Sequence, residues 1–210
     1  LSPVVGGSPL LEMADRLGCG KNFVLAAGIE NQPGTLPTLD SWQSPAALAN
    51  FSLGQGDRMA TPLQSAAMIN ASVNDGNYVQ PRLLEYTTDA DGRPVHTYES
   101  APSVSAMSKQ TANTLRDYMV QTVATGTAGT GMPAHGGAGA KTATAETGWI
   151  QDGHTVIQAW YAGFYPAEQP RYVIVVLAED GKTGSGTCGP IFKQIADRIY
   201  EELGAELGLQ

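Results

Sequence analysis

The chain has 210 residues, of which 42% are hydrophobic and 15% charged, and its formal net charge is −8. We expect residues 1–210 to form a single domain, since this length supports one sizeable core. The acidic balance and the absence of a Lys/Arg-rich run argue against nucleic-acid binding. No metal site is expected, because no CxxC pair exists and the three histidines have no neighbouring ligand cluster. A disulfide between the widely spaced Cys19 and Cys188 is left open.

Helix start and stop residues predict three helices in the first 124 residues. Each follows a serine or threonine that can cap it, and the expected ranges are about 9–17, 62–73 and 109–124. Residues 28–56 are rich in Pro, Gly, Ser and Asn and predict a long irregular loop. Two strands at about 82–88 and 93–99 are expected around a turn at 89–92.

The last third of the sequence predicts a small sheet followed by a helix. Strands are expected at about 139–147, 155–165 and 171–179, and their short connections make neighbours antiparallel. An amphipathic helix is expected from Pro190 to about Leu203. The fold class is therefore α+β, with an antiparallel three-strand meander packed against helices.

Two Lys-Thr stretches compete as the site of chemistry. Lys182-Thr183-Gly184 fails as a phosphate-binding loop, because Val176 stands where that loop needs glycine and no helix is expected to start at Thr183. We therefore expect a flexible link there. The other stretch, "GAKTATAETG" (139–148), is an extended small-residue segment along which a peptide can lie. On its own, it is equally consistent with a plain strand.

The wider pattern of motifs favours a particular family. In order, the chain carries "GQGDRMATPLQSA" (54–66), "INASVNDGNYVQPRLL" (69–84), "KTATAETG" (141–148), "AWYAGFYP" (159–166) and "PRYVIVVLAE" (170–179). Their order and spacing resemble the C-terminal half of the transpeptidase domain of penicillin-binding proteins, closest to the class without a glycosyltransferase. The likeness runs from about Leu10 to Tyr200.

This resemblance assigns roles to four residues. Lys141-Thr142-Ala143 matches the family's Lys-Thr-Gly strand, whereas the literal copy at 182 falls in a variable link. The resemblance implies that Lys141 binds the substrate carboxylate and tunes proton traffic. It implies that Thr142 and Thr144 contact that carboxylate, and that the backbone N–H of Thr144 stabilises the oxyanion. Ala143 replaces the family's glycine, and its effect on β-lactam reactivity is left open.

The family's other two motifs are not matched. No serine is followed by a lysine three residues later, so the Ser-x-x-Lys nucleophile and base are absent from the sequence. Ser72-Val73-Asn74 fits Ser-x-Asn literally but stands after the TPLQ segment, so we interpret it as a decoy. We expect the true motif to precede Leu1. The chain is then a partial transpeptidase domain without the nucleophile, which leaves a sheet edge unpartnered and the fragment inactive alone.

The resemblance implies a peptidoglycan D,D-transpeptidase that needs no cofactor. A serine of the full-length protein would be acylated by a D-Ala-D-Ala stem peptide, and β-lactams would inhibit it as substrate mimics. Expected partners are stem peptides, the upstream part of the domain and other cell-wall synthesis proteins. The expected location is the extracytoplasmic face of the membrane, with an N-terminal anchor outside this chain. Two alternatives stay open: a non-catalytic scaffold or partner-binding module, and a β-lactam hydrolase or sensor.

Overall fold

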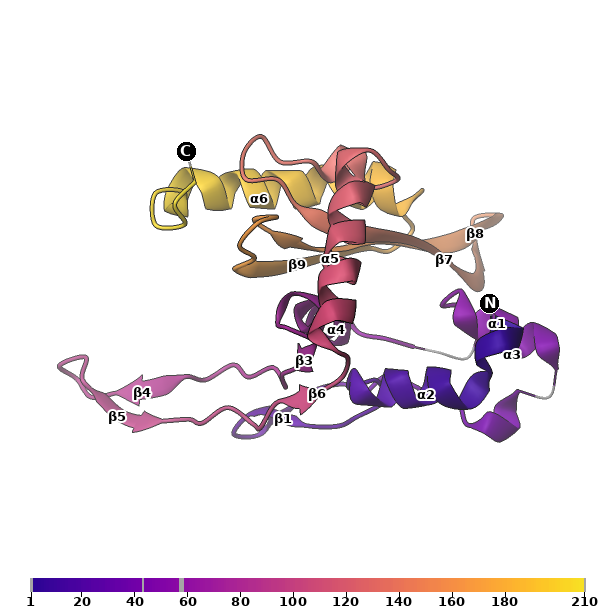
Figure 1. Cartoon of the computed structure of the whole chain (residues 1–210), viewed down its shortest axis with the longest axis horizontal. Coiled ribbons are helices and arrows are strands. Elements are labelled where there is room, and N and C mark those ends of the chain that lie inside the picture. The colour runs from indigo at the N-terminus through magenta and orange to yellow at the C-terminus, as the bar shows by residue number, and fades with distance from the viewer. Residues whose placement is uncertain (1, 43, 57–58, 210) are drawn as a thin grey trace. The chain divides into compact units, whose positions relative to one another are not determined.

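The computed structural model describes residues 2–42, 44–56 and 59–209, and these residues group into two compact units (Figure 1). The first unit contains the residues up to Ala71 together with Asn77–Met107. The second contains Ser72–Gly76 and the residues from Ser108 onward.

The first unit combines short helices with three two-stranded antiparallel pairs. Its helices are α1 (Ser2–Val5), α2 (Gly7–Arg16), the 3-10 helix η1 (Leu39–Ser41), α3 (Pro45–Ser52) and most of α4 (Pro62–Val73). The strand pairs are β1 (Val24–Ala26) with β2 (Ile29–Glu30), β3 (Asn77–Tyr78) with β6 (Val104–Ser105), and β4 (Tyr86–Thr88) with β5 (Pro94–Thr97).

The start of α4 confirms the predicted capping box. The Thr61 side chain accepts from the Gln64 N–H at 3.1 Å, and the Gln64 side chain accepts from the Thr61 N–H at 3.0 Å. These two bonds satisfy two backbone N–H groups at the helix start reciprocally. Further along α4, the buried Ala67 and Ala71 pack with Tyr78 in the core of this unit.

The prediction of an irregular loop over 28–56 was wrong for part of its length. Helix α3 begins after Ser44, whose side chain accepts from the Ala47 N–H at 3.3 Å, with Pro45 in the first turn. The same Ser/Thr-Pro signal predicted α4 correctly. At Ser44 this capping signal was not recognised, because Pro, Gly and Asn residues dominate the composition of residues 28–56. For the helix expected at 9–17 the predicted Ser8 cap was wrong, because α2 begins at Gly7 with Gly6 at its N-cap and Ser8 lies inside the helix.

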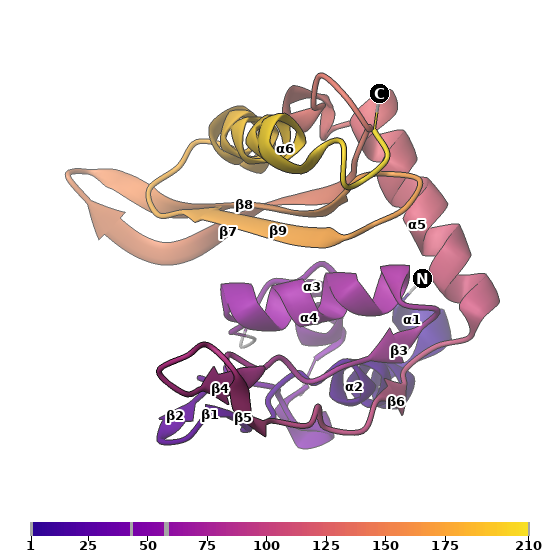
Figure 2. The ribbon, with the colours of Figure 1, turned by 90° about the vertical axis from the view of Figure 1, so that its left-hand side faces the viewer.

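The second unit confirms the predicted meander and fold class. Strands β7 (Gly139–Gln151), β8 (His154–Tyr165) and β9 (Tyr172–Ala178) form an antiparallel sheet in the order β7-β8-β9. Helix α5 (Lys109–Ala124) and the 3-10 helix η2 (Gly129–Gly131) precede the sheet. The π-helix η3 (Gly184–Cys188) and α6 (Gly189–Leu203) follow it. Helix α6 lies over one face of this sheet (Figure 2).

Aromatic side chains of β8 form the centre of the second core, as their position in a predicted strand indicated. Tyr161 is fully buried against Phe192 of α6, with ring centroids 4.7 Å apart. The Tyr161 hydroxyl donates to the Ala128 carbonyl at 2.7 Å. Burial raises the pKa of Tyr161 far above its ordinary value, so the phenol stays neutral and can keep donating.

Both cysteines are buried thiols, and no disulfide joins Cys19 to Cys188. Cys188 belongs to the second core, where its thiol donates to the Ala159 carbonyl at 3.1 Å. Burial raises the pKa of this thiol, which disfavours the reactive thiolate. Cys188 therefore acts as a small core residue.

The buried Tyr161 hydroxyl supplies a test of this core. Replacing it in Tyr161→Phe removes one of two donors to the Ala128 carbonyl, which still accepts from the Gly131 N–H at 3.1 Å, so we expect a loss of about 0.5–1.5 kcal/mol in the free energy of unfolding. Urea denaturation followed by circular dichroism measures this change. Tyr118→Phe on α5 is the matched control, because that side chain is 66% exposed, and equal effects of the two substitutions would contradict the assignment.

Candidate functional site

The candidate site is the outer edge of β7. Within the described part of the chain this strand pairs only with β8, so no second strand occupies its other edge, although the β7 carbonyls of Ala140 and Thr142 accept from the side chains of Thr122 and Lys141. An edge of this kind can accept an extended peptide as an added strand. The predicted residues Lys141, Thr142, Ala143 and Thr144 all lie on β7.

These four residues divide between the two faces of the sheet, because successive side chains on a strand alternate. Thr142 lies opposite Tyr161 of β8, which packs on α6, so Thr142 and Thr144 belong to the α6 side. Lys141 and Ala143 belong to the opposite side. The structure thus brings the four residues together along one strand, with the ammonium and the hydroxyls on different faces beside the same edge.

Lys141 places a positive charge beside the strand backbone. Its side chain is exposed, and Nζ donates to the Thr142 carbonyl. A cation held next to an unpaired strand edge attracts an anionic group on any chain that pairs there. This position fits a carboxylate at the end of an extended peptide.

The Ala143 methyl does not crowd the core behind the strand. Ala143 is exposed and points away from the α6 side. Its backbone, in contrast, is covered on the α6 side by Gly184. A methyl group replacing the family's glycine is therefore accommodated without displacing buried atoms.

The two Lys-Thr stretches meet in space. Gly184 of the literal Lys-Thr-Gly triplet packs on β7, and its N–H donates to Thr144 Oγ1 at 3.3 Å. A Cβ on Gly184 would lie 2.5 Å from the Ala143 carbonyl oxygen and 2.3 Å from that of Trp160. The literal copy therefore supports the strand that carries Lys141.

The prediction of a flexible link at 182–184 was wrong. The π-helix η3 starts at Gly184, and the Thr183 side chain caps it by accepting from the Gly186 N–H at 2.9 Å. Glycines at 184, 186 and 189 normally argue against a helix. Here Gly184 and Gly189 instead allow the chain to pack closely on its neighbours, because both are buried where a side chain would collide with other atoms.

Other candidate residues lie outside this strand edge. Ser72 is buried, with Oγ 3.9 Å from Met119 Sδ, so it is not placed as an accessible nucleophile. His154 contacts Asp180 at 3.0 Å, His135 stacks on Tyr200, and His96 packs edge-on to Tyr98. Among the residues that the structure describes, no three His, Cys, Asp or Glu side chains gather as a metal site.

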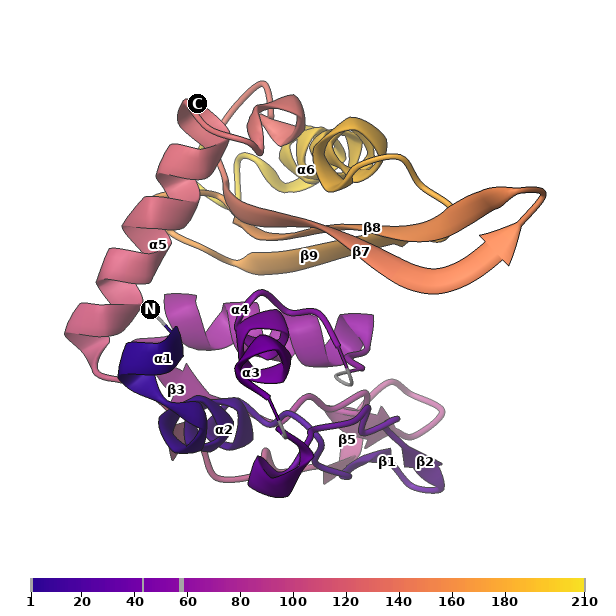
Figure 3. The same cartoon turned by 90° about the vertical axis from the view of Figure 1, so that its right-hand side faces the viewer.

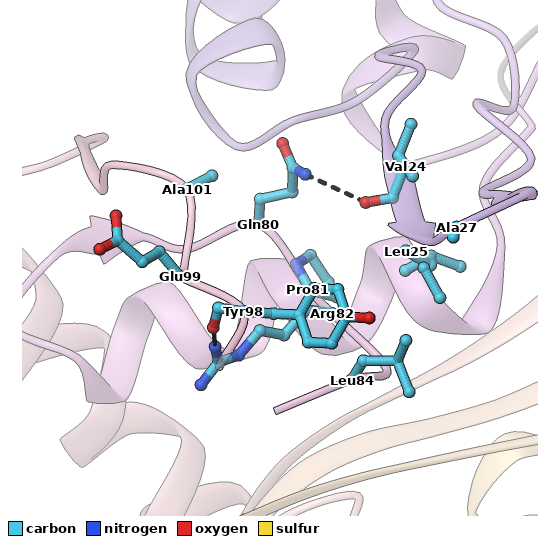
Figure 4. Close-up of a pocket in the computed structure, with 11 residues that line it drawn as sticks. Val24, Leu25, Ala27, Gln80, Pro81, Arg82, Leu84, Tyr98, Glu99 and Ala101 are labelled. Carbon is cyan, nitrogen blue, oxygen red and sulfur yellow. Dashed lines mark hydrogen bonds between the residues drawn. The ribbon is translucent and has the colours of Figure 1, made fainter. Parts of the chain in front are cut away.

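The first unit contains a cavity that no sequence motif indicates (Figure 4). Its volume is about 160 Å³, and segments 24–27, 80–84 and 98–101 contribute its lining. Gln80 donates to the Val24 carbonyl at 3.4 Å, and Arg82 donates to the Tyr98 carbonyl. These side chains tie the cavity walls together, and no nucleophile with an adjacent base lines the cavity.

Comparison with known proteins identifies the family. Residues 4–197 match the penicillin-binding protein transpeptidase domain. The chain is 34% identical over 182 residues to the peptidoglycan D,D-transpeptidase PbpA of Mycolicibacterium smegmatis, covering 81% of this chain and 37% of that protein. It is 32% identical over 221 residues to PbpB of the same organism, covering 96% and 33%. The chain belongs to the penicillin-binding protein transpeptidase domain family.

Solved structures agree with this assignment. Penicillin-binding protein 3 from Mycobacterium tuberculosis, complexed with aztreonam, matches with a TM-score of 0.79 and 28% identity, over 95% of this chain and 47% of that one. The ceftriaxone acyl-enzyme complex of penicillin-binding protein A from the same species gives a TM-score of 0.79 and 27% identity, over 92% and 43%.

The chain spans about a third of the length of these two curated relatives and just under half of these solved chains. In the described residues, no helix is both long enough and apolar enough to cross a membrane.

The contact between Gly184 and β7 can be tested by adding a methyl group. We expect Gly184→Ala to destabilise the protein by about 1–3 kcal/mol, because the new Cβ collides with two backbone carbonyls that cannot easily move. Gly129→Ala is the control, since its Cβ meets its nearest atom at an ordinary 3.7 Å. Thermal or urea unfolding distinguishes the two, and a neutral Gly184→Ala would show that η3 does not hold the strand.

Proposed function

We propose that this chain is the substrate-edge part of a peptidoglycan D,D-transpeptidase. The observation that carries the proposal is the unpaired, exposed edge of β7 with Lys141-Thr142-Ala143-Thr144 on it, in a chain of the transpeptidase family. The donor is a stem peptide ending in D-Ala-D-Ala. It lies along β7 as an added strand.

Each of the four residues has a role in this proposal. Lys141 attracts the terminal carboxylate of the donor and supports proton movement near the nucleophile. Thr142 and Thr144 contribute hydroxyl contacts to the carboxylate. The Thr144 hydroxyl accepts from the Gly184 N–H, which orients its own proton for donation. Ala143 contributes backbone alone.

The chemistry is acyl transfer in two balanced steps. A serine supplied by a part of the longer protein attacks the carbonyl of the penultimate D-Ala. The tetrahedral oxyanion is stabilised by backbone N–H donors, among them that of Thr144, and collapse releases the terminal D-Ala with a proton on its amine. The amine of a second stem peptide then attacks the ester, forming the cross-link and returning the proton to the serine. No metal or cofactor enters either step.

The relatives support β-lactams as mimics of this donor. Solved relatives include a complex with aztreonam and a ceftriaxone acyl-enzyme. Penicillins and cephalosporins carry a carboxylate, and aztreonam a sulfonate, beside the reactive carbonyl, so the same cationic strand edge suits them. We infer that penicillins acylate the same serine in the protein that contains this chain.

The proposal also includes a place and a partner. Cross-linking of peptidoglycan takes place at the extracytoplasmic face of the membrane, where we expect the protein to be anchored by a segment outside this chain. Its partners are the stem peptides and the upstream part of the same domain, with other cell-wall synthesis proteins as further candidates.

Labelling with a fluorescent penicillin tests the activity. We expect a stable covalent label on the full-length protein at a serine outside residues 1–210, located by peptide mapping, and no label on this chain alone. A folded full-length protein that takes no label would contradict the proposal and favour a non-catalytic scaffold. Rapid release of the label as hydrolysed product would instead favour a β-lactam hydrolase.

The role of Lys141 is tested by comparing the two Lys-Thr stretches. In the full-length protein, Lys141→Ala should slow penicillin acylation by about 10- to 100-fold, because a charged contact to the carboxylate is lost. Lys182→Ala is the matched control, since this exposed lysine precedes the literal triplet and should leave the rate unchanged. Equal acylation rates for the two variants would show that Lys141 does not contact the substrate.

A further inference from the structure

The far end of β7 carries two large apolar side chains in solvent. The β7–β8 hairpin extends beyond β9 as a projecting two-stranded ribbon (Figure 3), because β9 pairs only with residues 159–165 of β8. Trp149 and Ile150 lie near its end and are 72% and 76% exposed. Such exposure of a tryptophan beside an isoleucine marks a candidate contact surface.

A β-bulge produces this exposure. The pairing shifts from Glu146 opposite Ile157 to Ile150 opposite Thr155, so β7 advances four residues while β8 advances two. The Thr147 hydroxyl holds the bulge by donating to the Val156 carbonyl at 2.8 Å and accepting from the Trp149 N–H at 3.1 Å.

Gly148 completes the bulge with a φ of 76°, a conformation that favours glycine. Bulges of this kind re-aim a side chain and are frequent beside active sites. The Thr-Gly-Trp sequence thus specifies that Trp149 is presented outward from the strand.

The proposed direction of the donor leads to this bulge. Its carboxylate lies at Lys141 and Thr142, and its scissile carbonyl, which belongs to the preceding residue, lies at the N–H of Thr144. The rest of the donor must therefore continue past Thr144 toward residues 146–150. An extended strand rises about 3.4 Å per residue, so the five residues from Thr144 to Trp149 span about 17 Å at most. The bulge shortens this distance, because its extra residues do not extend the strand.

We propose that Trp149, with Ile150 beside it, forms a subsite for the part of the donor peptide about three to five residues upstream of the scissile bond. This inference rests on the proposed transpeptidase function. The occupant is peptide, because the subsite continues the strand edge along which the donor pairs. The tryptophan ring offers a large apolar surface with few rotatable bonds, which suits the aliphatic parts of an extended chain.

The test compares a short donor with a long one in the full-length protein. The probes are an N-acetylated dipeptide D-Ala-D-Ala and an N-acetylated pentapeptide with the same ending, together with a small penicillin. We expect Trp149→Ala to lower kcat/KM for the pentapeptide by about 3- to 10-fold and to leave the dipeptide and the penicillin unchanged. Trp149→Phe should retain most of the pentapeptide activity.

A control on the same unit separates the subsite from general surface effects. Tyr118→Ala on α5 removes another exposed aromatic side chain, 66% exposed, and should change none of the three rates. Circular dichroism of each variant verifies folding.

The remaining outcomes distinguish the two proposals. If the penicillin and the dipeptide react normally but Trp149→Ala handles the pentapeptide like the wild type, the subsite is overturned and the transpeptidase function stands. An equal loss on dipeptide and pentapeptide also overturns the subsite, because the effect would then lie at the reacting end. If the wild type reacts with none of the three probes, the proposed function fails and the subsite fails with it.

Discussion

The close approach of Gly184 to β7 is the constraint on which the candidate site depends. Because Gly184 has no side chain, η3 can lie directly on the backbone of Ala143 and Trp160. This contact places the Gly184 N–H at Thr144 Oγ1 and leads the chain into α6. The helix then covers one face of the sheet, and the face that carries Lys141 and Ala143 is the opposite one.

In this arrangement, one side of β7 packs against the rest of the unit, and the other side and the free edge can bind a peptide. On the α6 side, Tyr161 and Phe192 bury the sheet and Thr144 is held by a backbone donor. On the opposite side and along the free edge, Lys141 and backbone groups that no second strand pairs are available to a peptide. A rigidly backed strand of this kind pays little ordering entropy when a second strand pairs with it, which suits recognition by main-chain hydrogen bonds.

The sequence predicted those features that depend on local chemistry. The meander, the amphipathic α6 and the capping box at Thr61 and Gln64 follow from periodicity and caps, and the structure confirms them. The packing of Gly184 on β7 could not be predicted, because it joins residues forty positions apart and its glycine signal is the same as that of a flexible link. The bulge at Thr147 was missed for a similar reason, since a strand pattern gives no register.

The most direct test of the account is a crystal structure of the full-length protein acylated by a penicillin. We predict that the bound antibiotic lies beside the free edge of β7, with its carboxylate within hydrogen-bonding distance of Lys141, Thr142 or Thr144 and its carbonyl oxygen at the Thr144 N–H. An antibiotic bound away from β7, or with its carboxylate at Lys182, would contradict the assignment of this strand as the substrate edge.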